Sequence, residues 1–248
     1  AKLTLLELTQ DILSDMDSDE VNSINDTVES LQIAQMVKTT YYNIIDGKDW
    51  PWLKEMFALT GLGLTTKPSH MQIPETIIDI LWIKYNSRTS TDTKDVYQEI
   101  KYKTPEEFLT LTDARNSSLT NVETITDYGG TPLYIVNDAS PTYYTSFDEN
   151  YIVFDSYDSD VDTTLQTSKV KCFGKRNPTF TLSDSFTPDL PVQMFSYLLN
   201  EAKATAFLTA KQMVNQKAEQ HSITQRRRMS QEAWKVNNGI TYPSYGRK

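Results

Sequence analysis

The sequence has few cysteines and no long apolar runs, so it offers little for disulfide cross-linking or for crossing a membrane. It contains one cysteine, Cys172, in 248 residues, so an intramolecular disulfide is impossible and a disulfide scaffold is excluded. No apolar run approaches the roughly 20 residues that span a bilayer, and the best stretch, 77–83, is broken by Asp79. The first residues reach Glu7 and Asp11 too soon for the apolar region of a signal peptide. With 38% hydrophobic and 23% charged residues, we expect a soluble, untargeted globular protein.

Basic residues are scarce over the first two thirds of the chain and concentrated at its end. Residues 1–168 hold 11 Lys and Arg against 28 Asp and Glu, a balance of −17, whereas residues 169–248 hold 13 against 5, a balance of +8. Such asymmetry is typical of a docking surface for acidic protein, for neighbouring copies of the same chain, or for nucleic acid. Because the acidic bulk would repel phosphate, the composition favours a protein partner.

Both ends of the chain show helical periodicity. Apolar residues recur every three or four positions in residues 1–60, which predicts an N-terminal helical hairpin with Trp50 and Trp52 in its core. Residues 189–238 lack glycine and proline after Pro191, and we expect helices there that pack on the N-terminal pair, with either a break near Asn215 or a projecting arm. Residues 239–248 would form an extended docking tail.

The middle of the chain, residues 61–188, changes character. Short alternating runs separated by turn-forming residues predict an antiparallel β-rich domain. Thr104 and Pro105, followed by two glutamates, predict one short helix inserted in it. The expected fold is therefore α+β: a helical bundle built from both chain ends, an inserted antiparallel β-rich domain, and a long C-terminal helix with an extended tail. The expected strands are 76–85, 98–103, 121–126, 132–136, 142–147, 151–154 and 167–173.

One acidic segment has the spacing that begins a calcium-binding loop. Asp158, Asp160 and Asp162 alternate as in an EF-hand, but that loop requires glycine at its sixth place and glutamate at its twelfth. Thr163 and Lys169 occupy those places. The pattern favours a solvated acidic loop over a cation site.

Catalytic and zinc signatures are weak. One cysteine and two distant histidines, His70 and His221, do not supply four zinc ligands, and no nucleophile motif surrounds Cys172. Paired carboxylates for glycoside cleavage stay open, because any acidic protein offers such pairs. We expect no enzyme activity, no metal and no cofactor.

The most conspicuous charge cluster is Arg226, Arg227 and Arg228, near the end of the expected helix. One interpretation is a solvated helix face. The other is that these arginines bind an acidic or anionic partner together with aromatic anchors, as arginine and aromatic side chains do at interfaces. The anchors and the basic end of the tail would be Trp234, Tyr242, Tyr245, Arg247 and Lys248.

Two blocks of the sequence carry a resemblance to a known family. The first runs from Tyr144-Thr145-Ser146-Phe147-Asp148-Glu149 to Ile152-Val153-Phe154-Asp155-Ser156-Tyr157-Asp158. The second runs from Asp189-Leu190-Pro191 through Leu198-Leu199, Glu201-Ala202-Lys203, Ala206-Phe207 and Ala218-Glu219-Gln220 to Gln225-Arg226-Arg227-Arg228. With the opening helical pair and the chain length, the arrangement resembles the tail tubular protein A family, the head-to-tail adaptors of short-tailed (podovirus) phages.

The resemblance implies a structural virion protein at the head-to-tail interface, present in the cytoplasm of the infected bacterium during assembly. A dodecameric ring would sit beneath the portal protein and support the tail nozzle protein. Genomic DNA would pass through its channel without sequence-specific binding. The C-terminal helix and tail would reach the portal through Arg226–Arg228, Trp234, Tyr242, Tyr245, Arg247 and Lys248. The alternative is a tail-associated peptidoglycan hydrolase acting during entry. A free DNA-binding regulator is disfavoured by the net charge of −17 over residues 1–168.

Overall fold

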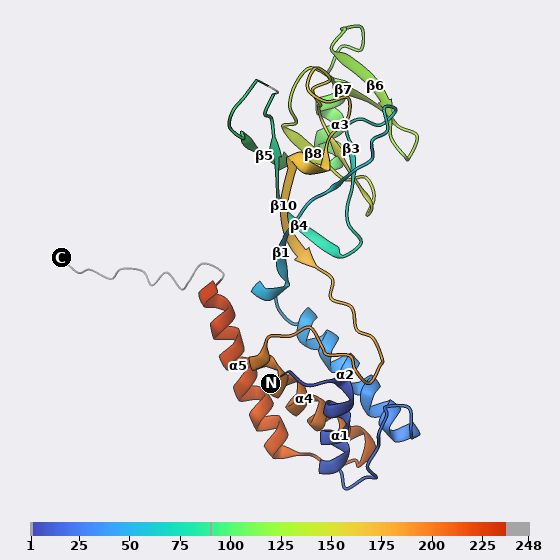
Figure 1. Cartoon of the computed structure of the whole chain (residues 1–248), viewed down its shortest axis with the longest axis vertical. Helices are drawn as coiled ribbons and strands as arrows, with labels where there is room; N and C mark the ends of the chain where they lie inside the picture. The colour runs from blue at the N-terminus through green and yellow to red at the C-terminus, as the bar shows by residue number, and fades with distance from the viewer. Residues whose placement is uncertain (1, 90, 237–248) are drawn as a thin grey trace, which may run out of the picture. The chain divides into compact units, whose positions relative to one another are not determined.

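The computed structural model describes residues 2–89 and 91–236, and its chain forms two compact units (Figure 1). A helical unit contains the residues up to Leu53 together with those from Pro178 on, and a sheet unit contains Lys54–Asn177. These divisions lie 7 and 11 residues before the expected boundaries at 60/61 and 188/189. The first boundary lies earlier because Lys54–Phe57 form a strand of the sheet. The second lies earlier because Phe180 and Phe186 pack into the helical core.

The described residues of the helical unit form four α-helices: α1 (Leu5–Asp15), α2 (Val28–Asp46), α4 (Val192–Ala210) and α5 (Gln216–Val236). Thr4 and Glu7 form a capping box at the start of α1. The cap of α2 is formed by Thr27 with Ser30. A short 3₁₀ turn, η1 (Pro51–Leu53), ends the N-terminal segment and buries Leu53.

The core of the helical unit is centred on α4. Leu198, Ala202 and Ala206 are fully buried, and α4 contacts α1, α2 and α5. Trp50 is buried as expected, and its indole N–H donates to the Ile44 carbonyl at 2.7 Å.

The sheet unit is built on one large mixed sheet and a separate hairpin. The sheet order is β1-β10-β4-β5-β8-β9-β3-β2, and β6 pairs with β7. All pairs are antiparallel except β5 and β8, which run parallel. The elements are β1 (Lys54–Phe57), β2 (Thr60–Gly61), β3 (His70–Gln72), β4 (Ile77–Asn86), β5 (Tyr97–Tyr102), α3 (Pro105–Asp113), β6 (Val122–Thr126), β7 (Pro132–Val136), β8 (Tyr143–Thr145), β9 (Tyr151–Phe154), the 3₁₀ turn η2 (Thr167–Lys169) and β10 (Val170–Arg176).

The predicted architecture was wrong, although the fold is α+β. The expected helical bundle is not matched: α5 packs chiefly on α4, because it buries few side chains, which among its described residues are Ala218, Ser222, Met229 and Ala233. The sheet is mixed rather than antiparallel, since α3 and the β6–β7 hairpin carry the chain back before β8 pairs with β5. The C-terminal helix is not one long helix but divides at 211–215, close to the break expected near Asn215, and Gln212 has a φ of 53° there.

Strand β4 is paired differently along its two halves. Ladder pairs with β10 run along it from Ile77 to Tyr85, whereas β5 pairs only with Ile83–Asn86. On the β5 side, none of the strands in the described residues pairs with 77–82. Two register shifts against β10 leave Ile78 and Leu81 as extra residues, which is the geometry of β-bulges. The sheet is therefore split beside the first half of β4.

Candidate partner-binding surfaces

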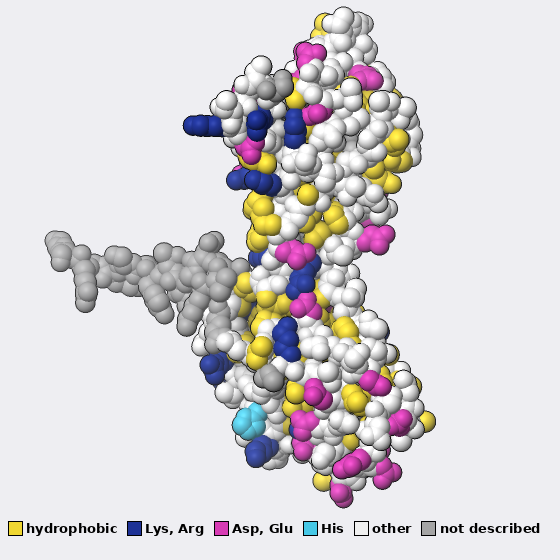
Figure 2. Space-filling model, in the orientation of Figure 1, with side chains coloured by type: hydrophobic (Ala, Val, Ile, Leu, Met, Phe, Trp, Pro, Cys, Tyr) yellow, Lys and Arg dark blue, Asp and Glu magenta, His cyan; other side chains and the backbone are white. Residues whose placement is uncertain are grey.

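The arginine cluster lies on α5, where successive side chains turn by about 100°. Arg226, Arg227 and Arg228 are all exposed, so together they spread over roughly 200° of the helix surface. On the visible face of the helical unit, Figure 2 shows the lysine and arginine side chains as separate groups. The buried side of α5 is fixed to α4 by Gln225, whose Nε2 donates to Ser196 Oγ at 2.6 Å.

Arg226 differs from its two neighbours because it lines a small pocket between α2, α4 and α5. The pocket has a volume of about 170 Å³ and is also lined by Lys48, Tyr197 and Glu201. Lys48 Nζ donates to the Ser230 carbonyl at 2.8 Å, and this contact joins the end of α2 to α5. Burial raises the pKa of Tyr197 and the charge of Glu201 adds to this, while Arg226 opposes it. Arg226 is thus oriented toward the unit's own helices.

The remaining predicted docking residues lie at or beyond the end of the description. Trp234 falls within α5, and its side chain is not described. Tyr242, Tyr245, Arg247 and Lys248 lie outside the described residues. The structure therefore brings the three arginines onto one helix and leaves their relation to the tail as a prediction.

The acidic loop after β9 carries its own counter-charge. Lys169 Nζ lies 2.5 Å from Asp162 Oδ2, and Asp158 Oδ1 accepts the amide of Asp160 at 3.1 Å. Lys169 occupies the twelfth place, where a calcium loop has its bidentate glutamate. Within the described residues, no group of three or more His, Cys, Asp or Glu side chains has a metal-binding arrangement.

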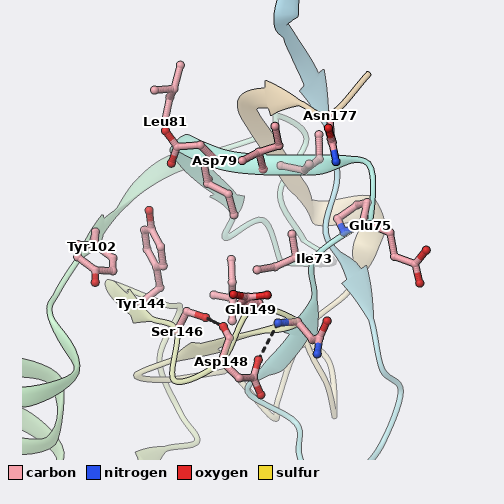
Figure 3. Close-up of a pocket in the computed structure, with 16 residues that line it drawn as sticks. Ile73, Glu75, Asp79, Leu81, Tyr102, Tyr144, Ser146, Asp148, Glu149 and Asn177 are labelled. Carbon is pink, nitrogen blue, oxygen red and sulfur yellow. Dashed lines mark hydrogen bonds between the residues drawn. The ribbon is translucent and has the colours of Figure 1, made fainter. Parts of the chain in front are cut away.

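A larger pocket occupies the split in the sheet, and the sequence did not indicate it. This β4 pocket has a volume of about 870 Å³ and lies between the first half of β4 and the turn that joins β8 to β9 (Figure 3). Its charged lining side chains are all acidic: Glu75, Asp79, Asp148 and Glu149. Within the described part of the chain, Glu75, Asp79 and Glu149 make no ion pair.

Apolar and aromatic side chains complete the lining of the β4 pocket. Ile78 is 57% exposed and Leu81 is 47% exposed, so two large aliphatic side chains stand at the bulges of β4 in contact with solvent. Tyr102 and Tyr144 lie edge to face with their ring centroids 5.5 Å apart. Burial raises the pKa of Tyr144 to about 12, and the negative charge of Asp79 contributes. The one visible signal in the sequence was Asp79 itself, which interrupts the apolar run 77–83.

The turn below the β4 pocket is held rigidly by Asp148. Its Oδ1 accepts the amides of Asn150 at 2.8 Å and Tyr151 at 2.7 Å, while Ser146 Oγ donates to the Tyr151 carbonyl at 2.8 Å. Asp148 therefore has a structural role that Asp79 and Glu149 lack.

A buried Ser–His–Asp chain joins β3 to the turn after β6. Ser69 Oγ lies 3.3 Å from His70 Nδ1, and His70 Nε2 lies 3.0 Å from Asp127 Oδ1. Burial lowers the pKa of His70, against the opposing influence of Asp127. Burial alone would raise the pKa of Asp127, but hydrogen bonds from the Gly129 amide and from His70 hold it below its ordinary value. Because Ser69 is fully buried, we interpret the chain as structural rather than as a nucleophile and its base.

Comparison with family models and with curated proteins gave no relationship. No family model matches the chain, and no curated protein matches it. Within the described residues, no helix is both long enough and apolar enough to cross a membrane.

Proposed function

We propose that the chain is a structural virion protein, a ring-forming head-to-tail adaptor that joins the portal to the tail nozzle of a short-tailed phage. The observation that carries the proposal is the family resemblance of the two sequence blocks around Tyr144–Asp158 and Asp189–Arg228. Its partners would be further copies of itself in a dodecameric ring, the portal protein and the nozzle protein. It would act without cofactor or catalysis.

The described surfaces support a docking role for α5. Arg227 and Arg228 are exposed on a helix that packs on α4 and buries Ala218, Met229 and Ala233. Exposed arginines on such a helix are suited to an acidic or anionic partner, because the guanidinium group makes bidentate hydrogen bonds to carboxylates. In this proposal α5 and the tail 239–248 contact the portal.

The net charge of the chain supports a wall that does not retain DNA. The sheet unit holds 12 Lys and Arg against 18 Asp and Glu, a net charge of −6, and the helical unit holds 12 against 15, a net charge of −3. Both units are therefore acidic overall, although the C-terminal third of the sequence is basic. An acidic wall repels phosphate and lets a duplex slide past.

The deciding experiment is native mass spectrometry of the full chain with and without the portal protein of the same phage. We expect a stoichiometric ring of this chain on the portal. A monomer that ignores the portal would reject the proposal.

The docking surface is tested by the double variant Arg227→Glu and Arg228→Glu in the same assay. Because these side chains are exposed, we expect the circular dichroism spectrum to stay unchanged while portal binding is lost. The matched control is Lys217→Glu with Lys211→Glu, which makes the same change of charge beside the α4–α5 connection rather than at the arginines in the middle of α5. Equal loss in both double variants would indicate general charge attraction instead of a docking site.

A further inference from the structure

We propose that the β4 pocket is a second docking site, which binds a segment of a partner protein that combines arginine or lysine with aliphatic side chains. This inference concerns the sheet unit, and only its choice of a different protein over a second copy of the chain rests on the proposed portal docking by α5. It rests on three features of the pocket: its charge, its exposed aliphatic side chains and the unpaired edge of β4.

The charge of the pocket selects a cationic occupant. Glu75, Asp79, Asp148 and Glu149 line it, and no lysine or arginine of the described residues does. All four residues are exposed. One carboxylate oxygen of Asp148 accepts the amides of Asn150 and Tyr151. A guanidinium or ammonium group entering between them would complement this field, and nucleic acid or an anionic membrane would be repelled.

The aliphatic side chains distinguish a protein segment from a small cation. Ile78 and Leu81 stand exposed at the two bulges of β4, and Ile73 and Ile77 continue the apolar lining inward. Bulges commonly re-aim side chains toward functional sites. Tyr102, which is 56% exposed, adds an aromatic face on which a guanidinium group can stack.

The unpaired edge of β4 gives the site room and backbone partners. Over residues 77–82 the strand is hydrogen-bonded to β10 on one side only, within the chain that the structure describes. Six strand residues extend for about 20 Å. A volume of about 870 Å³ lies near the upper end of the range for ligand pockets and suits several side chains of a peptide.

A second copy of this chain is the less favoured occupant. Its exposed arginines on α5 have the right charge, but the proposed function already assigns them to the portal. We therefore assign the β4 pocket to a different protein.

The test measures binding of labelled hexapeptides to the full chain by fluorescence anisotropy. The first probe alternates leucine with arginine, the second alternates serine with arginine, and the third alternates leucine with glutamate. We expect the leucine–arginine probe to bind, the serine–arginine probe to bind about tenfold more weakly, and the leucine–glutamate probe not to bind.

The pocket variant is Asp79→Asn with Glu149→Gln, and the matched control is Glu106→Gln with Asp113→Asn. The control removes the same charge from exposed carboxylates of α3 in the same unit. We expect the pocket variant to lower the affinity for the leucine–arginine probe about tenfold, and the control to leave this affinity unchanged.

Three results would overturn the proposal. Equal weakening by the two double variants would mean unspecific attraction to an acidic unit. Equal affinity for the leucine–arginine and serine–arginine probes would mean that Ile78 and Leu81 do not contribute to binding. Self-association in sedimentation that disappears only in the pocket variant would assign the pocket to a second copy.

Discussion

Arg115 and Asp155 form an ion pair inside the sheet unit, with Nη2 and Oδ2 3.0 Å apart and with 18% and 7% of their side chains exposed. The other carboxylate oxygen of Asp155 accepts the amides of Thr142 and Tyr143, at 2.9 and 2.8 Å. Arg115 Nη1 donates to the Tyr134 carbonyl at 2.9 Å. One aspartate, from a block that carries the family resemblance, thus joins the end of α3 to β7 and β8.

We expect Asp155→Ala to lower the free energy of unfolding by about 3–5 kcal/mol, because it leaves the Arg115 charge without its partner in a largely buried position. Asp155→Asn keeps an acceptor for the two amides and should cost less. Urea denaturation followed by circular dichroism measures both. Exposed Asp113→Asn is the control and should change stability by less than about 0.5 kcal/mol. A loss from Asp155→Ala no larger than the control would contradict this role.

The His70–Asp127 pair makes stability depend on pH. Burial lowers the pKa of His70 in the folded chain, so the unfolded chain, with a pKa of about 6.5, binds the proton first as the pH falls. The contribution of His70 to the free energy of unfolding is therefore fully present above about pH 7. It decreases as the pH falls through 6.5 to the lower pKa of the folded chain. The slope from this group is at most about 1.4 kcal/mol per pH unit.

Thermal denaturation at pH 7.5, 6.5 and 5.5 measures this dependence. We expect His70→Gln to flatten it, whatever that variant does to stability at pH 7.5. The control His221→Gln changes an exposed residue and should keep the wild-type slope. A wild-type slope that persists in His70→Gln would assign the effect to other groups.

Gly174 is required by the close approach of β10 to β4. A Cβ at this position would meet the Asp79 carbonyl oxygen, and Phe57 Cε1 at 2.8 Å. We expect Gly174→Ala to destabilise the chain by about 1–3 kcal/mol, because the backbone of β4 must move to admit the methyl group. Gly129→Ala is the control, since its Cβ would meet only the Asp127 carboxylate at 3.4 Å. Similar denaturation midpoints for the two variants would show that the approach is not tight.

The purified chain should not clear peptidoglycan in a turbidity assay, since the proposed function is structural. Clearing that is lost in the Asp79→Asn and Glu149→Gln double variant would instead favour the hydrolase alternative, with these two carboxylates as its acid and base. Clearing that survives in this variant would point to other carboxylates or to a contaminant.

Local signals in the sequence predicted several elements well. Thr104 and Pro105 open α3 as expected, and the predicted strands 132–136 and 151–154 agree with β7 and β9. These segments carry their own caps, turns or alternation, so neighbouring residues determine them.

Pairing between distant segments was not predictable in the same way. Residues 53–57 have helical spacing of apolar side chains, but Lys54–Phe57 form β1 because they pair with Cys172–Lys175 of β10. The β4 pocket likewise combines side chains from four segments, near residues 73–81, 102, 144–152 and 177. Nothing in the local sequence brings these together. The spread of the three arginines around α5, by contrast, follows from helical geometry alone.

The pairing of β1 with β10 also sets the order in which the two units can be completed. The first and last strands of the sheet unit lie side by side, with Lys54 opposite Lys175, so this unit has all its strands once residue 177 has been synthesised. The helical unit still lacks α4 and α5 at that stage, and α1 and α2 have no α4 to cover them. During synthesis we therefore expect the segment in the middle of the sequence to fold first, while the first segment made waits for the last.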